Sequence, residues 1–386
     1  MATVAAFRSE APAGSHGGGA VEPVTNSVGH GNLMALRYPG AGSGGVPLAT
    51  LYVMSFASTG LHHVTAIAGR PQANIEYYVR LLGLRLVKRT VNYDDPQTYH
   101  LYFGGPLGQP GTVITFFPWA GAGPAVRGAG ETTAVAFRVP VGALDAWRQR
   151  LTDHQISFTT AERFGQAVVA FLDPDGTPLE LAEGETGIRA LNWPGAPVSD
   201  TMALQGLHSV SVAAPQLDKT VAVLTGALGL QVVSEDRVAG GARAVRLAPG
   251  AAQTALPNAV SYPAGGYVDL LEVPSASPAR LGTGSIHHFA LRSSAADLEE
   301  VRERLLAEGL TPTPIKNRHY FKSVYFKEPG GAVLEVATDA PGFTVDEPAD
   351  ELGLAFKLPE WLESERDFLR ARLPVTASPE YADRWT

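Results

Sequence analysis

Apolar and polar positions follow the same order four times along the chain. Each copy has a short apolar strand, a loop, an amphipathic helix and then strands that close on an apolar run. In the first copy the helix carries apolar residues at i, i+3, i+4 and i+7, and Gly83 ends it, as glycine commonly does at a helix C-terminus. Similar helices end at Gly229 in the third copy and at Gly309 in the fourth. A repeat of this kind predicts one supersecondary unit, here a βαβββ module, used four times.

The first strand gives each module an alignment point. Histidine pairs begin this strand in the first and fourth copies. The second copy is degenerate: Gln155 stands where the other helices have glycine, and counting back from it reaches an alanine. The aligned strand-one positions are His63, Ala134, His208 and His288.

The closing strands can be aligned as well. In the first, second and fourth copies, a polar residue with apolar neighbours stands four residues after a glycine. The third copy carries extra loop before this strand. The aligned closing positions are Thr115, Glu180, Glu272 and Glu335.

Four βαβββ modules in this arrangement resemble the vicinal oxygen chelate superfamily, which includes glyoxalase I, extradiol dioxygenases and bleomycin-resistance proteins. The resemblance covers residues from about 57 to 340 and implies an α+β fold with the modules in two paired domains. In four-module members, modules 1 and 4 enclose one cavity and modules 2 and 3 enclose the other. Metal ligands of the superfamily lie at the start of the first strand and in the last strand.

Under this pairing the first cavity receives His63, His288, Glu335 and the non-ligand Thr115. Two histidines and one carboxylate leave open positions on a metal ion, as non-heme Fe(II) oxygen chemistry requires. A carboxylate between the apolar neighbours of Glu335 is costly to bury unless it is paired or bound to metal. The sequence therefore predicts a metal site of His63, His288 and Glu335. The second cavity, with Glu180, His208 and Glu272, is expected to hold no metal.

His62 and His287 stand next to the predicted ligands. Because residues i and i+2 share a face of a strand, His62 and His287 should point away from the metal. If the strand is bulged, both residues should instead flank the site and support its ligands. The sequence leaves these two arrangements open.

A closer resemblance is to the dioxygenases that cleave the ring of hydroquinones. It runs from about residue 54 to 373, through segments 60–69, 87–90, 99–103, 108–112, 163–166, 286–288, 316–318, 329–331 and 342–347. It implies the same three metal ligands and places Arg318 and Tyr325 beside the substrate. Arg318 could neutralise a phenolate and Tyr325 could act as a general acid, with His62 or His287 assisting.

The resemblance implies an enzyme that opens a hydroquinone or catechol with O₂, so the expected partners are a small aromatic substrate and O₂. Fe(II) is the expected cofactor, and Mn²⁺ is the alternative ion for this ligand set. Two other functions stay open: a glyoxalase-type isomerase or lyase, and a metal-free protein that binds or sequesters aromatic compounds. The Thr115 position argues against the glyoxalase type, which more often has a fourth ligand there.

Composition and charge exclude several classes of protein. Lys and Arg number 30 against 38 Asp and Glu, a net charge of −8 without long runs of either sign, so nucleic acid is not an expected partner. With no cysteine, disulfides, thiolate metal sites and a cysteine nucleophile are excluded. No apolar stretch suits a membrane span, and we expect a cytoplasmic protein. A homo-oligomer is left open.

The chain divides into four expected parts. Residues 1–56 are rich in Gly, Ala, Ser and Pro and are expected to be disordered, with Met54 as the natural start. Residues 57–192 should form the N-terminal domain with modules 1 and 2, and residues 201–340 the C-terminal domain with modules 3 and 4. Residues 341–386 form a tail, in which an amphipathic helix is expected near residues 359–369.

Overall fold

The computed structural model describes residues 56–119, 121–184, 191–237, 241–250 and 266–377. The expected disorder of residues 1–56 and the expected start at Met54 lie outside the described residues, except for residue 56. Among the described residues, no helix has both the length and the apolar character that crossing a membrane requires.

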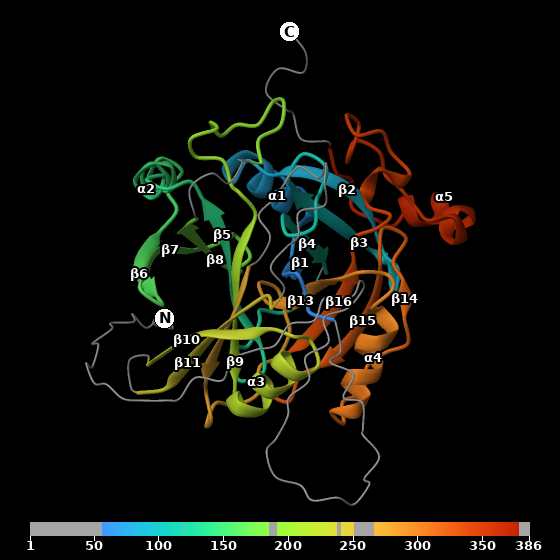
Figure 1. Ribbon diagram of the computed structural model, residues 1–386. Coiled ribbons are helices and arrows are strands. Elements are labelled where there is room, and N and C mark those ends of the chain that lie inside the picture. Colours follow the sequence, from blue (N-terminus) through green and yellow to red (C-terminus); the bar gives the residue numbers. More distant parts are fainter. Residues whose placement is uncertain (1–55, 120, 185–190, 238–240, 251–265, 378–386) are drawn as a thin grey trace, which may run out of the picture.

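The four βαβββ modules are present, each with one helical segment after its first strand (Figure 1). Module 1 contains β1 (Leu61–Ala68), α1 (Pro71–Glu76), the π-helical turn η1 (Tyr77–Leu81), β2 (Arg85–Asn92), β3 (Asp95–Gly104) and β4 (Val113–Pro118). Module 2 contains β5 (Thr132–Val139), α2 (Leu144–Asp153), β6 (Phe158–Arg163), β7 (Gln166–Leu172) and β8 (Pro178–Glu183). Module 3 contains β9 (Leu207–Ala214), α3 (Leu217–Gly226), β10 (Gln231–Arg237), β11 (Arg243–Ala248) and β12 (Tyr267–Glu272). Module 4 contains β13 (Ile286–Ser293), α4 (Leu298–Ala307), β14 (Lys316–Asn317), β15 (Lys322–Lys327) and β16 (Val333–Thr338).

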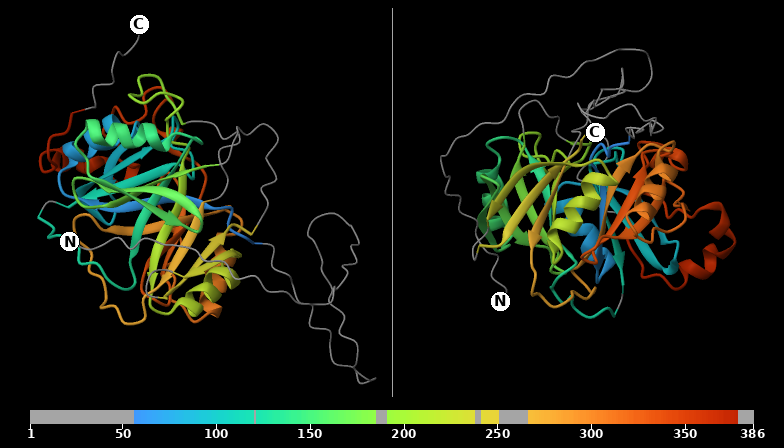
Figure 2. Two further views of the ribbon diagram at one scale, coloured as in Figure 1. Left: turned by 90° about the vertical axis from the view of Figure 1, so that its left-hand side faces the viewer. Right: turned by 60° about the horizontal axis from the view of Figure 1, so that its bottom comes forward.

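The predicted pairing of the modules is confirmed. Strand β1 of module 1 pairs antiparallel with β13 of module 4, and β5 of module 2 pairs antiparallel with β9 of module 3. Each pair of modules curls into one half of the molecule, with blue and orange strands in one half and green and yellow strands in the other (Figure 2). The halves join where Ile286 of β13 pairs with Thr132 of β5. The α+β fold is thus confirmed. The division at residues 192–201 stays a prediction, and the hydrogen-bonded sheets cross it.

Helices cover the outer faces of these sheets because their apolar stripes match the strands beneath them. In α2, for example, Leu144, Trp147 and Leu151 are buried while the intervening polar residues are exposed or half-buried. These side chains belong to one large core cluster that runs through all four modules. The inner faces of the sheets are left to line the two cavities.

Four β-bulges mark equivalent positions in the modules. In the first pair, the register of β1 and β13 shifts at His62 and again at His287. In the second pair, the shifts between β5 and β9 fall at Thr133 and His208. The bulges therefore align His208 with His287, and the residue that matches His288 is Ser209. The predicted alignment of His208 with His288 was wrong by one residue.

The closing strand of module 3 also differs from the prediction. Ser211 of β9 stands beside Asp269 of β12, as Ala290 stands beside Glu335 in module 4. Asp269, and not Glu272, occupies the closing position. The extra loop before β12 hid this register from the sequence.

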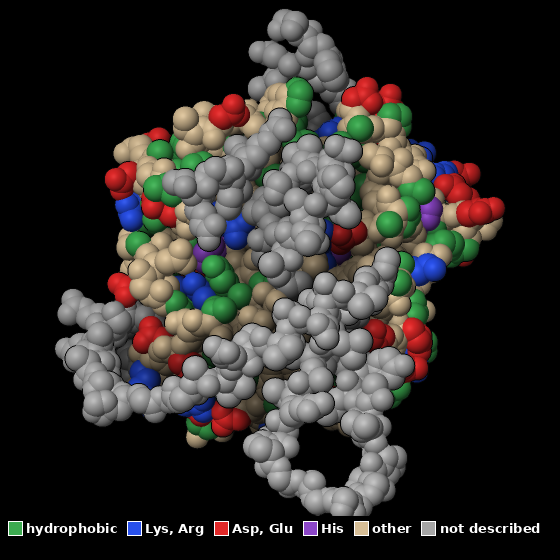
Figure 3. Space-filling model, viewed as in Figure 1, with side chains coloured by type: hydrophobic (Ala, Val, Ile, Leu, Met, Phe, Trp, Pro, Cys, Tyr) green, Lys and Arg blue, Asp and Glu red, His purple; other side chains and the backbone are tan. Residues whose placement is uncertain are grey.

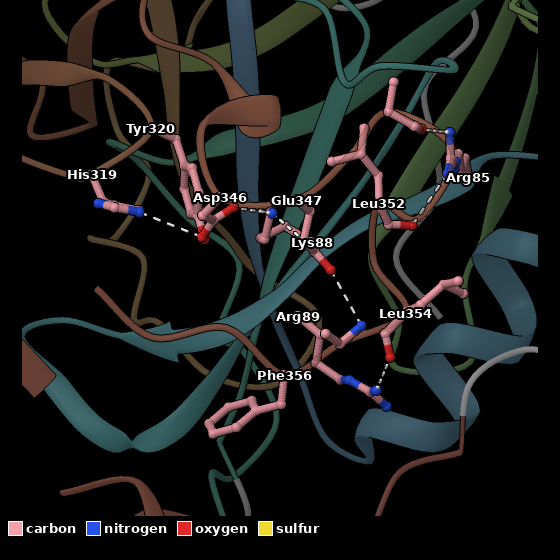
Figure 4. Close-up of polar contacts among 12 residues, drawn as sticks. Arg85, Lys88, Arg89, His319, Tyr320, Asp346, Glu347, Leu352, Leu354 and Phe356 are labelled. Atoms are coloured by element: carbon pink, nitrogen blue, oxygen red, sulfur yellow. Dashed lines mark hydrogen bonds and ion pairs between the residues drawn. The ribbon is translucent and has the colours of Figure 1, made fainter. Parts of the chain in front are cut away.

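The C-terminal segment folds back onto β2 of module 1 (Figure 4). Lys88, which is fully buried in β2, pairs with Asp346 at 2.6 Å and with Glu347. Arg89 donates from Nη2 to the carbonyl of Leu354 at 2.8 Å. Beyond this segment, the expected helix near 359–369 is a 3-10 helix, η3 (Glu360–Glu365), followed by the short α5 (Arg366–Arg370).

Candidate functional site

Two imidazoles and one carboxylate converge inside the sheet of modules 1 and 4. His63 lies on β1, His288 on β13 and Glu335 on β16, and one donor atom from each lies within 4.8 Å of the others. Nε2 of His63 is 3.1 Å from Oε2 of Glu335, and Nε2 of His288 is 3.0 Å from the same oxygen. The sheet brings them together because β13 pairs with both β1 and β16. All three side chains are buried.

The neighbouring histidines orient the rings of this cluster. Nδ1 of His62 lies 2.8 Å from Nδ1 of His63, and Nε2 of His62 lies 3.2 Å from the carbonyl of Thr338. Burial and the adjacent His63 lower the pKa of His62 to about 3, so this ring is neutral. Because a carbonyl only accepts, Nε2 of His62 carries the proton and its Nδ1 must accept from Nδ1 of His63. Nε2 of a neutral His63 then directs a lone pair toward Glu335.

The fourth module repeats this contact. Nδ1 of His287 lies 2.8 Å from Nδ1 of His288. Burial and the neighbouring His288 lower the pKa of His287 to about 3. Unlike His62, His287 is half-buried, and its ring lies against Phe117 and Trp119. The structure therefore has the bulged arrangement, in which both histidines flank the cluster.

The donor set fits a divalent metal ion. Burial raises the pKa of Glu335, but positive charge on the imidazoles of His63 and His288 would outweigh burial and hold that pKa well below its usual range. Within the described part of the chain, neither oxygen of Glu335 accepts a hydrogen bond of acceptable geometry. Neutral imidazoles would direct lone pairs at a buried carboxylate, which is repulsive, and a cation bound by all three groups would make the contacts attractive.

Thr115, at the fourth aligned position, forms hydrogen bonds with residues outside the three-residue cluster. Its hydroxyl donates to Oγ1 of Thr65 at 2.8 Å, and Nε2 of His100 lies 2.8 Å from Oγ1 of Thr115. Nδ1 of His100 is in turn 2.8 Å from the hydroxyl of Tyr102. Burial first, and then the nearby His63 and His288, lower the pKa of His100 well below its ordinary value. This chain of hydrogen bonds fixes one wall of the site.

Tyr325 and Arg318 lie together beside the three-residue cluster. Tyr325 of β15 is directly opposite Glu335 of β16, and its ring contacts that of His288. Nε of Arg318 donates to the Tyr325 hydroxyl at 3.1 Å, while Nη2 donates to Asp94 at 2.7 Å. Burial and the nearby Glu335 raise the pKa of Tyr325, so its hydroxyl stays protonated.

A cavity of about 410 Å³ opens above the cluster. The cavity is lined by His63, His288, Tyr325, Arg318 and His287, whereas His62 and Glu335 are not among its lining residues. Its lining also includes residues that the sequence analysis did not assign to the site: Tyr93, Asp94, His100, Tyr102, Phe117, Trp119 and Phe321.

Strand periodicity could have found several of these missed residues. Thr115 and Phe117 are two residues apart on β4, and His100 and Tyr102 are two apart on β3, so each pair shares a face. Tyr102 stands opposite Thr115 in the register of these strands. Applying the period of two outward from Thr115 would therefore have placed this wall of the cavity.

The second cavity, between modules 2 and 3, has a different chemistry at its aligned positions. Those positions are Ala134, Glu180, Ser209 and Asp269. Nη2 of Arg163 donates to Glu180 at 2.8 Å, and Arg246 donates to both oxygens of Asp269 at 2.7 Å. Each carboxylate already has a cationic partner and the histidines are absent from these four positions, so this group does not match the metal-binding pattern of the first cavity.

The fold and the three-residue cluster define a protein of paired βαβββ modules with a candidate metal site. The sequence model of the Glyoxalase/Bleomycin resistance protein/Dioxygenase superfamily matches residues 60–181 and 206–336, and the chain belongs to this superfamily.

Several relatives within it are close in sequence. The chain is 39% identical over 318 residues to the "Putative ring-cleaving dioxygenase MhqO" of Bacillus subtilis, covering 81% of this chain and 95% of that protein. It is 34% identical over 317 residues to the "Chlorohydroquinone/hydroquinone 1,2-dioxygenase" of Sphingobium indicum, covering 80% and 94%. The resemblance to ring-cleaving dioxygenases of hydroquinones is confirmed.

Solved structures agree with the fold. A crystal structure described as a putative dioxygenase from Bacillus subtilis superposes with a TM-score of 0.75 at 37% identity, covering 83% of this chain and 98% of that one. Glyoxalase I from Zea mays superposes with a TM-score of 0.52 at 14% identity, covering 72% and 92%, which shows the fold alone.

Proposed function

We propose that this chain is an Fe(II)-dependent dioxygenase that opens the ring of a hydroquinone or catechol beside a hydroxyl-bearing carbon, as an extradiol-type enzyme does. The observation that carries the proposal is the convergence of His63, His288 and Glu335, with both histidines lining an aromatic-walled cavity. Relatives named as ring-cleaving dioxygenases support it.

His63, His288 and Glu335 would hold the iron in this proposal. Two histidines and a carboxylate are the ligand set of many non-heme Fe(II) oxygenases, and the bound ion supplies the redox chemistry between the aromatic substrate and O₂. Thr115 adds no strong ligand, because its hydroxyl is bonded to Thr65 and His100. Mn²⁺ is the alternative ion for the same donors.

Arg318 and Tyr325 would act on the substrate's oxygens. The guanidinium of Arg318 favours a phenolate at the cavity wall, because the charge is partly buried there. An N–H of Arg318 donates to the oxygen of Tyr325, so the phenol's own hydrogen can be donated to a substrate oxygen. His287 lies at the wall with Phe117 and Trp119, where its neutral ring can form a hydrogen bond with a substrate oxygen.

The aromatic walls would bind the ring and exclude water. Phe321 contacts the rings of both His62 and His63, and Phe117 stacks on Trp119. A planar substrate would bury apolar surface against these rings, and the dry surroundings strengthen the polar contacts. The volume of about 410 Å³ lies within the range of small-molecule sites.

The test is O₂ uptake by protein reconstituted anaerobically with Fe(II) and given a panel of hydroquinones and catechols. We expect uptake with at least one of these compounds, and His288→Ala should lower it by roughly a hundredfold or more, since even supporting residues of a metal site are worth about 10–100-fold. His154→Ala, at an exposed position after α2, is the matched control and should keep full activity.

Other outcomes would contradict the proposal. Full turnover by His288→Ala would overturn the ligand assignment. Metal-dependent conversion of a hemithioacetal without O₂ consumption would favour an isomerase instead. Aromatic binding without any bound metal after reconstitution would favour a sequestering protein.

A further inference from the structure

The cavity between modules 2 and 3 is larger than the candidate metal site. Its volume is about 680 Å³, and most of its lining is apolar, with Phe158, Phe164 and Phe171 among the side chains. Leu172, which is 56% exposed, stands at its rim. An apolar cavity of this size is well suited to a small organic molecule and poorly hydrated by water.

The charged groups of this cavity are balanced. Arg163 pairs with Glu180, Arg246 pairs with Asp269, and Arg127 lies 3.4 Å from Glu131. Among the described residues that line the cavity, an ionic ligand would therefore find no charged partner beyond these pairs. A neutral ligand would not disturb these pairs.

The buried carboxylates can still accept hydrogen bonds. Glu180 and Asp269 are 4% and 6% exposed, and this burial raises the pKa of each despite their arginines. A carboxylate has about four lone-pair sites, and the arginine contact to Glu180 uses Oε1. A hydroxyl group on the ligand could donate a hydrogen bond to one of the remaining lone pairs of these carboxylates.

The backbone conformation of Phe164 is an independent indication of a ligand site. It adopts a φ of 47° in the turn between β6 and β7, a conformation that bulky residues rarely take and that Asn or Gly takes more easily. Its ring covers the guanidinium of Arg246, with Cζ 4.4 Å from the ring centroid, and lines the cavity. Strain of this kind tends to be kept where a side chain is needed by a ligand.

We propose that this second cavity is a metal-independent binding site for a neutral aromatic molecule that carries a hydroxyl group. The rings of Phe158, Phe164 and Phe171 pack on its apolar body, and Glu180 or Asp269 accepts from its hydroxyl. The site is separate from the candidate metal cavity and does not depend on the proposed function.

The test measures binding of 2-naphthol by its fluorescence, with naphthalene and 2-naphthoate as matched probes. We expect 2-naphthol to bind, naphthalene to bind about tenfold more weakly because it lacks the hydroxyl, and anionic 2-naphthoate to bind more weakly still because of Glu180 and Asp269. Equal affinity for the anion would overturn the proposed chemistry.

Variants locate the bound probe. Ala134→Phe and Ala244→Phe fill the cavity from different strands, and each should weaken 2-naphthol binding at least tenfold while the unfolding transition stays cooperative. Phe164→Asn should also weaken binding, because it removes a ring from the lining. Val333→Phe fills the metal cavity and is the matched control, which reports any probe bound there.

Two results would overturn the site. One is binding that survives both filling variants, and the other is binding that is lost in Val333→Phe alone. Failure of O₂ uptake in the enzyme assay leaves this test unaffected, because 2-naphthol binding is measured without metal or O₂.

Discussion

Single atoms decide how the candidate site is organised. The carbonyl of Thr338 accepts from Nε2 of His62, which leaves Nδ1 of His62 as the acceptor for His63. The Thr338 carbonyl thus determines, through the His62 ring, that Nε2 of His63 is the nitrogen free to bind a metal. Supporting contacts of this type orient metal ligands in many proteins.

Replacing His62 tests this arrangement. His62→Phe removes the acceptor for Nδ1 of His63, so we expect Fe(II) affinity to fall by about 10–100-fold. His62→Asn offers an amide oxygen near the lost acceptor and should recover part of the affinity. Competition with a chromophoric chelator measures both variants. Equal affinity in the parent and His62→Phe would show that the contact has no role in binding.

A second residue-scale prediction concerns Asp173, in the turn between β7 and β8 of module 2. Its Oδ1 accepts from the backbone of Asp175 and Thr177, and its Oδ2 accepts from the Tyr78 hydroxyl at 3.0 Å. Burial raises the pKa of Asp173 to about 6, although the hydrogen bonds from Thr177 and Tyr78 oppose it. A carboxyl group with a raised pKa in the fold contributes stability below its unfolded pKa and loses that contribution as the pH rises through about 6.

Asp173→Asn should therefore stabilise the protein at neutral pH. The amide keeps the acceptor for the two backbone groups but carries no charge. We expect the difference in unfolding free energy between the variant and the parent to grow by on the order of 2 kcal/mol from pH 4 to pH 7. Urea denaturation at both values measures it, with the pH 4 result as the internal reference. A difference that is independent of pH would contradict the argument.

Residue spacing, together with the ligand positions that the superfamily resemblance implies, predicted much of the candidate site. His63, His288 and Glu335 were chosen from the repeat, and the structure brings the three together. His208 and Glu272 were misaligned because a β-bulge and an inserted loop each change the register without changing the residue pattern. The sequence did not indicate His100, because its place at the cavity wall depends on how β3 pairs with β4.

At the scale of elements, the end of each module helix has the same geometry. Gly83, Gly229 and Gly309 have φ values of 73°, 68° and 77°, and Gln155 has 59° at the matching place after α2. The degenerate second copy thus keeps the left-handed conformation without the residue that adopts it most easily. The sequence could predict this position because the chain must turn there in every module.

Exchanging these residues gives a matched pair of variants. Gln155→Gly should stabilise the protein by about 1 kcal/mol, because glycine adopts this conformation without the penalty of a side chain. Gly309→Gln should destabilise it by a similar amount, and a Cβ there meets open space, so no steric clash is added. Thermal denaturation measures both. Loss of stability in Gln155→Gly would contradict the assignment of strain to this residue.

In the C-terminal tail, the sequence predicted which side chains are buried but not the type of helix. Leu362 and Leu369 are buried and Trp361 and Phe368 are 49% exposed, so the segment is amphipathic as expected. It is nevertheless split into η3 and the five-residue α5. Periodicity reports which side chains face the body, whereas the backbone bonds of so short a segment are set by its packing.

At the scale of the whole molecule, one fold carries two cavities with different chemistry. Both sheets have the same pairing and the same bulges, yet only the pair of modules 1 and 4 places imidazoles at the aligned positions. On the described part of the face in Figure 3, acidic and basic side chains are interspersed, in keeping with the absence of a strongly basic binding surface there. The pairing of distant modules could be predicted only through the family resemblance, because spacing within a module does not show which modules meet.

The C-terminal segment connects the outside of the molecule to the metal cavity. Phe343 of this segment packs on Tyr102, whose hydroxyl bonds to His100 in the cavity wall. The buried ion pairs of Lys88 with Asp346 and Glu347 hold the segment in place (Figure 4). The segment is therefore expected to support the site as well as the fold.

Lys88→Met tests that connection. It leaves the carboxylates of Asp346 and Glu347 without their buried cation, so we expect a loss of about 3–5 kcal/mol of stability, measured by chemical denaturation. Adding Asp346→Asn and Glu347→Gln should recover much of this loss, because the unpaired charges are then removed. Lys322→Met, at an exposed position on β15, is the control and should change stability by less than about 0.5 kcal/mol. If Lys88→Met is as stable as this control, the ion pairs do not hold the segment, and the support of Tyr102 must come from the packing of Phe343 alone.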